Sequence, residues 1–259
     1  AELASLADRR VPVVVSERFM YTHLSPRVRA QQQLHRLATW ITVNSHHQRE
    51  RMERLFPWMK GKLSTIYNGV DLGTFAPPAA RRTDAGGPPR LLAVASTARK
   101  KNALGLARAL GLLRRSGREV PLVSWAGVPK TADDRAAKAE VDAALAQEGV
   151  ADRWGWLGNR SDVPELMREH DALVHPAFFE GLPNAVCEAL ASGLPVLASD
   201  VCDHPRLVSA DRGLLFDPSS PEDMAAALAR FAATSPEERH DMSRAARGFA
   251  ERELALERY

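Results

Sequence analysis

The stretch that decides the fold is residues 178–195, which read FFEGLPNAVCEALASGLP. It follows an apolar run that ends at His175 and leads into a second apolar run that begins at Val196. Pro183 suits the first helical position, so we expect a helix to begin near Asn184. A strand, a loop, a helix and a second strand in this order are typical of a parallel sheet wrapped by helices. The stretch therefore predicts an α/β fold.

The rest of the chain repeats this alternation of short apolar runs with longer stretches of helical period. We expect strands at residues 11–16, 39–44, 63–67, 90–96, 121–126, 154–157, 172–175, 196–199 and 214–216. Ser220 carries the capping chemistry of a helix start, and so does Ser235 with Glu238 three residues later. Asn68-Gly69 predicts a sharp turn, because both residues tolerate positive φ. The predicted fold class is α/β, with a parallel sheet flanked by helices.

Composition excludes several classes of function. The chain has 259 residues, of which 45% are hydrophobic and 26% charged. It contains 35 Lys and Arg residues against 32 Asp and Glu residues. These are ordinary values for a soluble globular protein, and the small charge surplus predicts no nucleic-acid partner. The two cysteines, Cys187 and Cys202, form no CxxC pair, which favours a cytoplasmic location and argues against a zinc site. We expect no metal and no resident cofactor.

The start of the central helix is suited to an anion or a polar sugar. The first amides of this helix, from Asn184, Ala185 and Val186, are expected to point out of its N-terminus with the positive end of the helix dipole. Gly181 lets the backbone come close to a ligand. The sequence therefore predicts a phosphate or sugar site at this point.

Two carboxylates flank that helix start, Glu180 in the loop and Glu188 inside the helix. Helical side chains lean toward the N-terminus, so Glu188 is expected to reach back to the mouth of the site. There a carboxylate can accept two hydrogen bonds from a vicinal diol such as a ribose. The alternative is a solvent glutamate plus a carboxylate that the helix dipole stabilises.

This segment resembles the Glu-x7-Glu signature of retaining GT-B glycosyltransferases, especially family 4, the glycosyl transferases group 1. Members commonly carry EGLPN, then EA and a small-residue-Gly-x-Pro-Val stretch, and this chain has all three. Further matches occur in order along the chain, at Asn68-Gly69-Val70-Asp71 with Phe75 and Pro77, at Leu157-Gly158 with Asp162-Val163, and at Gly213-Leu214-Leu215. The resemblance covers roughly residues 40–259.

The resemblance implies roles for these residues. Glu180 would contact hydroxyls of the donor sugar and Glu188 the ribose. The sugar or phosphate would bind along the residues after Glu180, which are Gly181, Leu182, Pro183, Asn184 and Ala185. Retaining enzymes of this type are thought to use assistance from the departing phosphate, so the two glutamates are not expected to act as acid and nucleophile.

The family also has a Gly-Arg-Leu segment with a lysine six residues after the glycine, and this arginine and lysine hold the donor diphosphate. Here Ala95 and Ser96 stand where the glycine and arginine are usual, and Lys101 is retained. We expect Lys101 to serve catalysis with Glu180, and Ser96 and Arg99 to bind the donor. Two cations around a diphosphate would stabilise the charge that develops as the nucleotide leaves. The alternative is a basic loop in solvent.

A GT-B enzyme has two Rossmann-like halves, and this chain resembles the donor half with part of the other. We expect a remnant of the N-terminal acceptor domain at residues 1–60, the donor-binding domain at 61–235 and a crossover helix at 236–259. The chain begins with Ala1 and has no counterpart of the Gly-rich phosphate loop or of the catalytic histidine often found in that half. We therefore expect truncation at the start, with truncation at the end as a further alternative.

The function that the resemblance implies is transfer of a sugar from a nucleoside-diphosphate sugar, UDP- or GDP-linked, to a glycan or lipid-linked glycan in bacterial polysaccharide biosynthesis. The alternatives are a GT-B nucleotide-sugar epimerase and a non-catalytic fragment that binds a nucleotide sugar. Several arginines allow peripheral contact at the inner face of a membrane, although such charges usually form a solvated helix face: Arg27, Arg29, Arg36, Arg49, Arg51 and Arg54.

Overall fold

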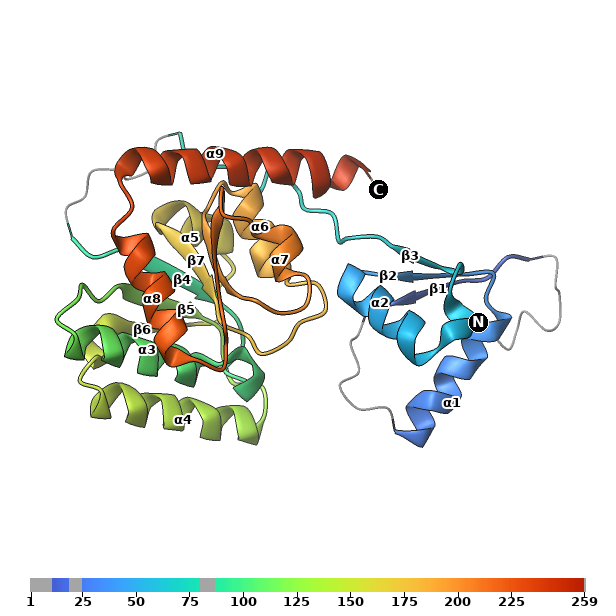
Figure 1. The fold of residues 1–259 in the computed structure, drawn as a ribbon, viewed down its shortest axis with the longest axis horizontal. Helices are drawn as coiled ribbons and strands as arrows, with labels where there is room; N and C mark the ends of the chain where they lie inside the picture. The colour runs from blue at the N-terminus through green and yellow to red at the C-terminus, as the bar shows by residue number, and fades with distance from the viewer. Residues whose placement is uncertain (1–10, 19–24, 80–86, 259) are drawn as a thin grey trace. The chain divides into compact units, whose positions relative to one another are not determined.

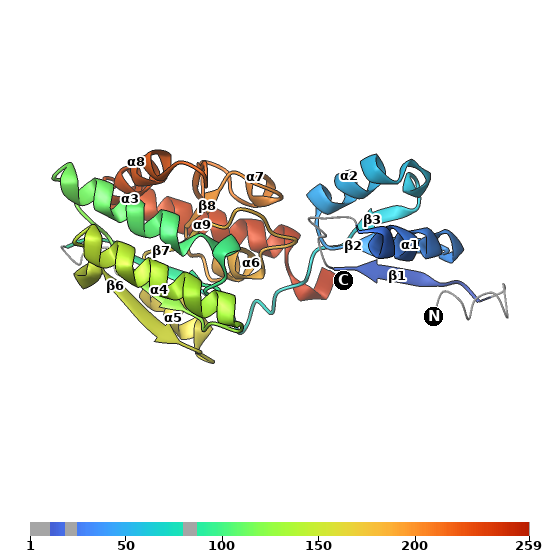
Figure 2. The ribbon, with the colours of Figure 1, turned by 90° about the horizontal axis from the view of Figure 1, so that it is seen from below.

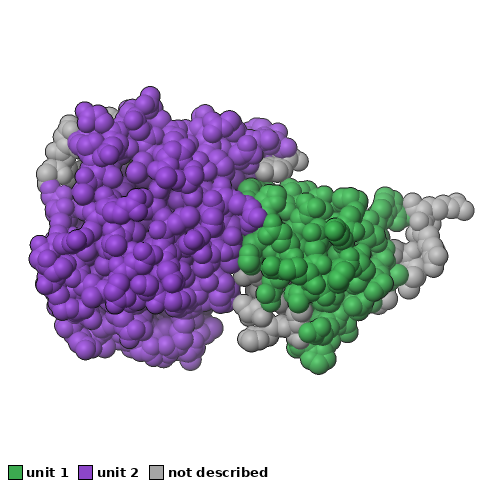
Figure 3. Space-filling view, in the orientation of Figure 1, with its two compact units in different colours: residues 1–68, 180–182, 259 green, residues 69–179, 183–258 purple. Residues whose placement is uncertain are grey.

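The structure is a computed structural model that describes residues 11–18, 25–79 and 87–258. Contacts divide the chain into two compact units, drawn in different colours in Figure 3. The first is Ala1–Asn68 with Glu180–Leu182, and the second is Gly69–Phe179 with Pro183–Arg258. The division falls after Asn68 instead of after residue 60, because residues 63–65 are a strand of the first unit's sheet.

The first unit holds a parallel sheet in the order β1-β2-β3. Its elements are β1 (Val14–Glu17), α1 (Pro26–Leu34), η2 (His35–Leu37), β2 (Trp40–Val43), α2 (His46–Leu55), η3 (Pro57–Met59) and β3 (Leu63–Thr65). Ser25 and Ser45 start the two α-helices, because each side chain accepts a hydrogen bond from an amide three residues on. Ile41, Val43 and Met59 lie in the core. A second, smaller α/β unit therefore precedes the larger one, as predicted.

The second unit is built on a six-stranded parallel sheet (Figure 1). Its strands are β4 (Arg90–Val94), β5 (Leu122–Ala126), β6 (Trp154–Gly158), β7 (Ala172–His175), β8 (Val196–Ser199) and β9 (Gly213–Phe216), in the order β6-β5-β4-β7-β8-β9. β7 and β8 are buried at every position, as strands covered on both faces must be. The predicted parallel α/β fold is confirmed.

Helices cover this sheet. They are η4 (Arg99–Lys101), α3 (Ala103–Arg115), α4 (Ala132–Gln147), η5 (Ala151–Arg153), α5 (Val163–Glu169), α6 (Asn184–Ala191), α7 (His204–Leu207), α8 (Pro221–Ala232), α9 (Pro236–Glu253) and η6 (Leu256–Arg258). α3 packs against both α4 and α8, while α6 packs against α9. Figures 1 and 2 show α3 and α4 side by side. Leu110 of α3, Trp125 of β5 and Phe231 of α8 belong to one core cluster.

The predicted elements agree well with the structure. Each expected strand is present, and β7 and β8 have the predicted bounds to the residue. The Ser235 hydroxyl accepts from the Glu238 amide at 3.2 Å and the Glu238 carboxylate from the Ser235 amide at 2.7 Å, so this capping box is confirmed. Ser220 caps α8 through the Asp223 amide. A second capping box, at the start of α4, was not predicted.

The predicted turn at Asn68-Gly69 is wrong. Among the described residues neither of the two has a positive φ, and the turn lies at residues 72–74. Asp71 holds it, because its carboxylate accepts from the Thr74 hydroxyl at 2.7 Å and from the amides of Thr74 at 3.1 Å and Gly73 at 2.9 Å. These hydrogen bonds, that of the Thr74 hydroxyl first, lower the pKa of Asp71. Gly69 has a steric role instead, since a Cβ there would lie 2.8 Å from the Cα of Leu256.

α9 fastens the start of the second unit. The Arg247 guanidinium donates to three carbonyl oxygens, those of Leu72 at 3.2 Å, Phe75 at 3.0 Å and Ala191 at 2.8 Å. The Val70 amide donates to the Leu254 carbonyl at 2.7 Å. The segment after Gly69, the end of α6 and the last helix are thus one packed body.

Candidate functional site

The topology singles out one place on the second unit's sheet. The winding of the chain reverses between the neighbouring strands β4 and β7, which leaves the loops after these strands on opposite sides of a crevice at their carboxyl ends. Ligands of open α/β sheets bind at such a switch point. The loop after β4 carries Ser96, Arg99 and Lys101, and the loop after β7 leads to α6 with Glu188. The structure therefore brings the predicted donor residues of this unit to one edge.

The loop after β4 is packed tightly against its neighbour. The Ala95 carbonyl accepts from the Trp125 indole at 2.8 Å, and a Cβ at Gly127 would lie 1.9 Å from the same oxygen. Only glycine fits at 127 as a result. Ser96 is half-buried, and Lys101, also half-buried, ends the 3-10 turn η4. The backbone of Lys101 is thus part of a hydrogen-bonded turn.

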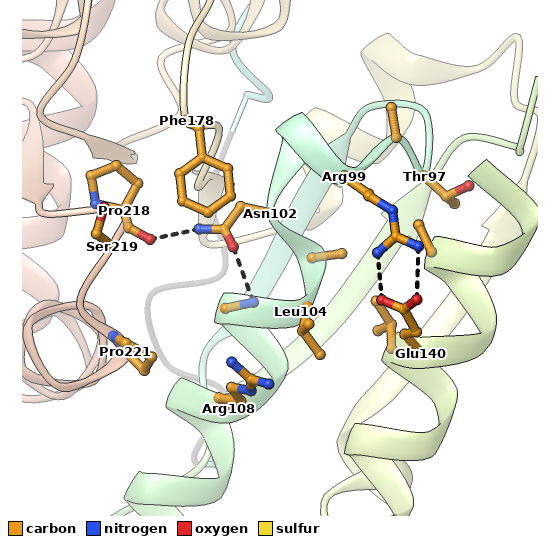
Figure 4. Close-up of a pocket in the computed structure, with 15 residues that line it drawn as sticks. Thr97, Arg99, Asn102, Leu104, Arg108, Glu140, Phe178, Pro218, Ser219 and Pro221 are labelled. Carbon is orange, nitrogen blue, oxygen red and sulfur yellow. Dashed lines mark hydrogen bonds and ion pairs between the residues drawn. The ribbon is translucent and has the colours of Figure 1, made fainter. Parts of the chain in front are cut away.

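Arg99 is directed away from the crevice. Its guanidinium makes two bonds to Glu140 of α4, at 2.5 and 2.7 Å (Figure 4). It makes a third bond to Asp133, at 3.2 Å. These two carboxylates raise the pKa of Arg99. The charge of Arg99 is thus already balanced within the unit, and a role at the diphosphate stays a prediction.

The loop after β7 is tied to its neighbours on both sides. The Phe178 amide donates to the Lys100 carbonyl at 2.9 Å, which joins it to the β4 loop. The Lys100 ammonium also lies 5.3 Å from the centre of the Phe179 ring. On the other side the Ser199 hydroxyl, fully buried at the end of β8, donates to the Ala177 carbonyl at 2.6 Å. The two loops of the crevice form one hydrogen-bonded frame.

Glu180, Gly181 and Leu182 group with the first unit. Within that unit, a Cβ at Gly181 would meet only ordinary contacts, Asn44 Oδ1 at 3.7 Å and the Arg18 carbonyl at 3.8 Å. The protein's own packing in this unit does not demand a glycine here. The prediction that Gly181 lets a ligand approach the backbone closely stays a prediction.

α6 begins at Asn184 as predicted, with Pro183 one position before the first helical residue. The expectation for the Val186 amide is wrong, because it donates to the Pro183 carbonyl at 2.9 Å. This amide is therefore used in a hydrogen bond of the first helical turn and does not point toward a ligand. Asn184 is exposed and Ala185 half-buried, so both lie on the accessible rim of the helix start.

Glu188 is the most telling side chain of the site. It is half-buried, and within the described part of the chain its carboxylate makes no hydrogen bond and no ion pair. Burial raises its pKa above the ordinary 4.5. A carboxylate that has lost water without gaining a donor is destabilising unless a ligand supplies one. The neighbouring Cys187 is buried, which raises the pKa of its thiol, so it serves packing and not nucleophilic attack.

Two cavities lie in the second unit close to this crevice. One of about 290 Å³ is lined by α3, α4 and the loop after β9, including Arg108 and Pro221 (Figure 4). The other, about 550 Å³, lies at the carboxyl ends of β8 and β9 beside Asp200 and Asp217. Phe178 borders both. Neither is lined by Lys101 or Glu188, so the site rests on topology and side-chain chemistry.

Sequence reasoning did not find Asn102 or Ser199, which hold the two loops. A signal existed for Asn102, since asparagine directly before an Ala- and Leu-rich stretch is a strong N-cap. No local signal marked Ser199, whose partner Ala177 lies in another loop. Among the described residues, no group of three or more His, Cys, Asp or Glu is placed to hold a metal ion. Nor does that part of the chain contain a helix long and apolar enough to span a membrane.

Comparison with known proteins gives two family matches. Residues 80–249 match the model of "Glycosyl transferases group 1", and residues 1–74 match that of "Glycosyltransferase Family 4". The D-inositol 3-phosphate glycosyltransferase of Saccharomonospora viridis is 30% identical over 237 residues, which are 87% of this chain and 54% of the relative. The lipopolysaccharide glucosyltransferase WaaG of Escherichia coli is 35% identical over 96 residues, 36% of this chain and 26% of WaaG. The chain spans about half or less of these relatives.

Solved structures agree on the fold. HepE of Anabaena in complex with UDP superposes with a TM-score of 0.85 at 19% identity, over 99% of this chain and 72% of HepE. The crystal structure of WaaG gives a TM-score of 0.70 at 23% identity, over 88% of this chain and 64% of WaaG. At such low identity these likenesses establish the fold alone, and they confirm the predicted GT-B type architecture.

Proposed function

The chain belongs to the glycosyl transferases group 1 family, and we propose that it carries the donor half of a retaining glycosyltransferase. The sugar would pass from a nucleoside-diphosphate sugar to a glycan or lipid-linked acceptor. Two relatives named for glycosyl transfer support the reaction class, and one of them is named for lipopolysaccharide. HepE crystallised with UDP and with UDP and glucose supports a UDP-linked donor over a GDP-linked one.

The observation that carries the proposal is the half-buried Glu188 carboxylate without a donor in the described chain. A ribose presents two neighbouring hydroxyls, and each can donate to one oxygen of a carboxylate. Hydrogen bonds to a charged acceptor are stronger than those between neutral groups, so this contact would repay the desolvation of Glu188. The nucleoside would therefore bind over the start of α6.

Lys101 would meet the diphosphate on the other side of the crevice. It ends the η4 turn, at the carboxyl end of β4, next to the strand that leads to α6. Its ammonium would stabilise the negative charge that grows on the diphosphate as the sugar leaves. Ser96, in the same loop, would add a hydroxyl donor.

The chemistry needs no carboxylate nucleophile. The bond between the anomeric carbon and the donor phosphate oxygen breaks, the acceptor oxygen bonds to the same face of that carbon, and the acceptor proton passes to the departing phosphate. Glu180 would hold hydroxyls of the transferred sugar, and the backbone at Gly181 and Leu182 would approach it closely. The donor is a substrate, and the proposal includes no resident cofactor or metal.

We also propose that the enzyme works in the cytoplasm, at the inner face of a membrane where lipid-linked acceptors are found. Support comes from Arg27, Arg29 and Arg54, which are exposed on α1 and α2. Exposed cations on one unit attract anionic lipid headgroups. Sedimentation with anionic and with neutral vesicles tests this, and equal binding to both would contradict it.

Thermal melts test the donor site directly. The chain is heated with UDP, GDP, ADP and their sugar conjugates, alongside the variants Glu188→Ala and Glu237→Ala. Glu237 is a matched control, because it is an exposed glutamate in the first turn of α9. A ligand at 100 times its Kd adds about 2.7 kcal/mol, which for a chain of this size raises the Tm by roughly 5 to 10 °C.

We expect a shift with one base, kept in Glu237→Ala and lost in Glu188→Ala. A shift that survives in Glu188→Ala would remove the ribose assignment. No shift with any nucleotide would overturn the donor site in this chain.

A further inference from the structure

Asn102 follows Lys101 directly and has an unusual backbone. Its φ of 57° and ψ of 36° lie in the left-handed region, where among the described non-glycine residues only Cys202 also has positive φ. Side chains clash with the backbone there, although asparagine tolerates the conformation better than most residues. Such a conformation persists only where surrounding contacts hold it.

Asn102 is buried, with 5% of the residue exposed, and its side-chain amide is bonded at both ends. Its Oδ1 accepts from the Gly105 amide at 3.1 Å, which caps α3, and its Nδ2 donates to the Pro218 carbonyl at 2.8 Å (Figure 4). The two ends have opposite roles, so the amide group has one orientation that satisfies both. Its backbone amide closes the η4 turn by donating to the Arg99 carbonyl at 3.0 Å.

The first turn of α3 is shaped to admit this side chain. A Cβ at Gly105 would lie 2.5 Å from Asn102 Oδ1, closer than real contacts allow. Glycine inside a helix is destabilising relative to alanine. The sequence bears that cost at the one position where the Asn102 amide needs room.

The bond to Pro218 reaches across the sheet. Pro218 follows β9, and β7 and β8 lie between β9 and β4 in the strand order. On the other side of Lys101, the Lys100 carbonyl accepts from the Phe178 amide. Both sequence neighbours of Lys101 are therefore hydrogen-bonded to other loops. Lys100 is bonded to the loop after β7, and Asn102 is bonded to the loop after β9.

We propose that Asn102 is a positioning residue for Lys101, fixing the turn that aims the lysine ammonium at the donor diphosphate. The inference rests on the proposed function, since it needs a diphosphate at Lys101. Its basis is the left-handed backbone, the doubly bonded buried amide and the space that Gly105 leaves for it.

The test is a double-mutant cycle on nucleotide binding. Titration calorimetry with UDP and with GDP is run on the wild type, Asn102→Gly, Lys101→Ala and the double variant. Glycine keeps the left-handed backbone and removes both side-chain bonds. We expect Asn102→Gly to weaken binding about tenfold alone and less than twofold in the Lys101→Ala background, because the residue acts through the lysine.

A second variant and a control separate positioning from general stability. Asn102→Asp keeps the cap on α3 but loses the donor to Pro218, and it should weaken binding as Asn102→Gly does. Ser235→Ala removes the capping box of α9, so it should lower the Tm with affinity unchanged.

Equal weakening by Asn102→Gly in both backgrounds, or unchanged affinity in the wild-type background, would overturn the positioning role while the donor site stands. Unchanged affinity in Lys101→Ala, or no nucleotide binding by the wild type, would overturn the proposed function and this inference with it.

Discussion

The two sides of the crevice differ in how many of their polar and charged side chains have hydrogen-bond partners within the protein. On the β4 side, Arg99 is held by Glu140 and Asp133, and Asn102 is bonded at both ends of its amide. On the α6 side, Glu188 is half-buried without a donor in the described chain. A buried polar group that has its hydrogen-bond partners within the protein stabilises the fold, whereas one without a partner gains free energy when a ligand supplies it. The difference teaches that satisfied groups such as Arg99 and Asn102 belong to the scaffold, whereas the unsatisfied Glu188 is the group we expect to act as receptor for a ligand.

The largest effect should come from Glu188→Gln. The amide keeps the shape but presents only one acceptor oxygen, and we expect about a hundredfold loss of nucleotide affinity in titration calorimetry. The unliganded protein should be no less stable at pH 7 in urea melts, because a desolvated charge has been removed. Lower stability together with intact affinity would reverse the two roles and break the comparison.

Lys101→Ala should be next, with about thirtyfold weaker binding of UDP or GDP, since a charge-assisted contact to the diphosphate is lost. The nucleosides uridine and guanosine provide the control, because they lack the diphosphate and should bind both proteins alike. An equal loss with the nucleosides would place Lys101 away from the diphosphate.

Binding should also weaken in acid. Burial raises the pKa of Glu188 above 4.5, and the protonated carboxyl no longer accepts two hydroxyls, so affinity falls as the pH drops through that raised pKa. The limiting slope is about tenfold per pH unit. The unliganded fold gains relative stability in the same window, because the folded state binds the proton more tightly. Titrations of Glu188→Gln control for protonation of the nucleotide and should lack this step.

Ser199→Ala should affect stability more than binding. It removes the buried bond to the Ala177 carbonyl, which we expect to cost about 1–3 kcal/mol in urea unfolding, with affinity reduced only a few-fold. Ser209→Ala, an exposed serine, should change stability by less than about 0.5 kcal/mol. A large affinity loss with unchanged stability would move Ser199 from scaffold to receptor.

The smallest effect should come from releasing Arg99. Glu140→Gln removes its bidentate partner, and we expect no more than about a twofold change in nucleotide affinity, because exposed ion pairs are weak. Tighter binding by tenfold, abolished by adding Arg99→Ala, would show that the guanidinium reaches the diphosphate once it is free.

Much of the fold was predictable because its signals are local. β7 and β8 each consist of three apolar residues followed by one polar residue, and Pro or Asp residues flank them, so their bounds are visible in the sequence. β3 is shorter than expected, ending at Thr65, since only residues 63–65 pair with β2. The predicted turn at Asn68-Gly69 was wrong because glycine is also required where another part of the chain packs too closely for a side chain. Here that part is Leu256, far along the sequence.

The site was predictable in location but not in its electrostatics. The Glu-x7-Glu spacing brought Glu180 and Glu188 to notice, yet nothing local reveals that Glu188 lacks a donor. Arg99 meets Glu140 across the gap between the η4 turn and α4, and such a pairing depends on how two helical elements pack. Sequence shows which charges exist, whereas packing determines which of them are balanced.

The three hydrogen bonds of the Arg247 guanidinium affect how the second unit unfolds locally. Because one guanidinium joins the carbonyls of Leu72, Phe75 and Ala191, the segment after Gly69 opens only when α9 lifts from α6. The Val70 amide, bonded to Leu254, should then exchange with deuterium at the rate of the last helix, in one cooperative step. The local stability of the segment at the start of the second unit therefore depends on a residue near the far end of the sequence.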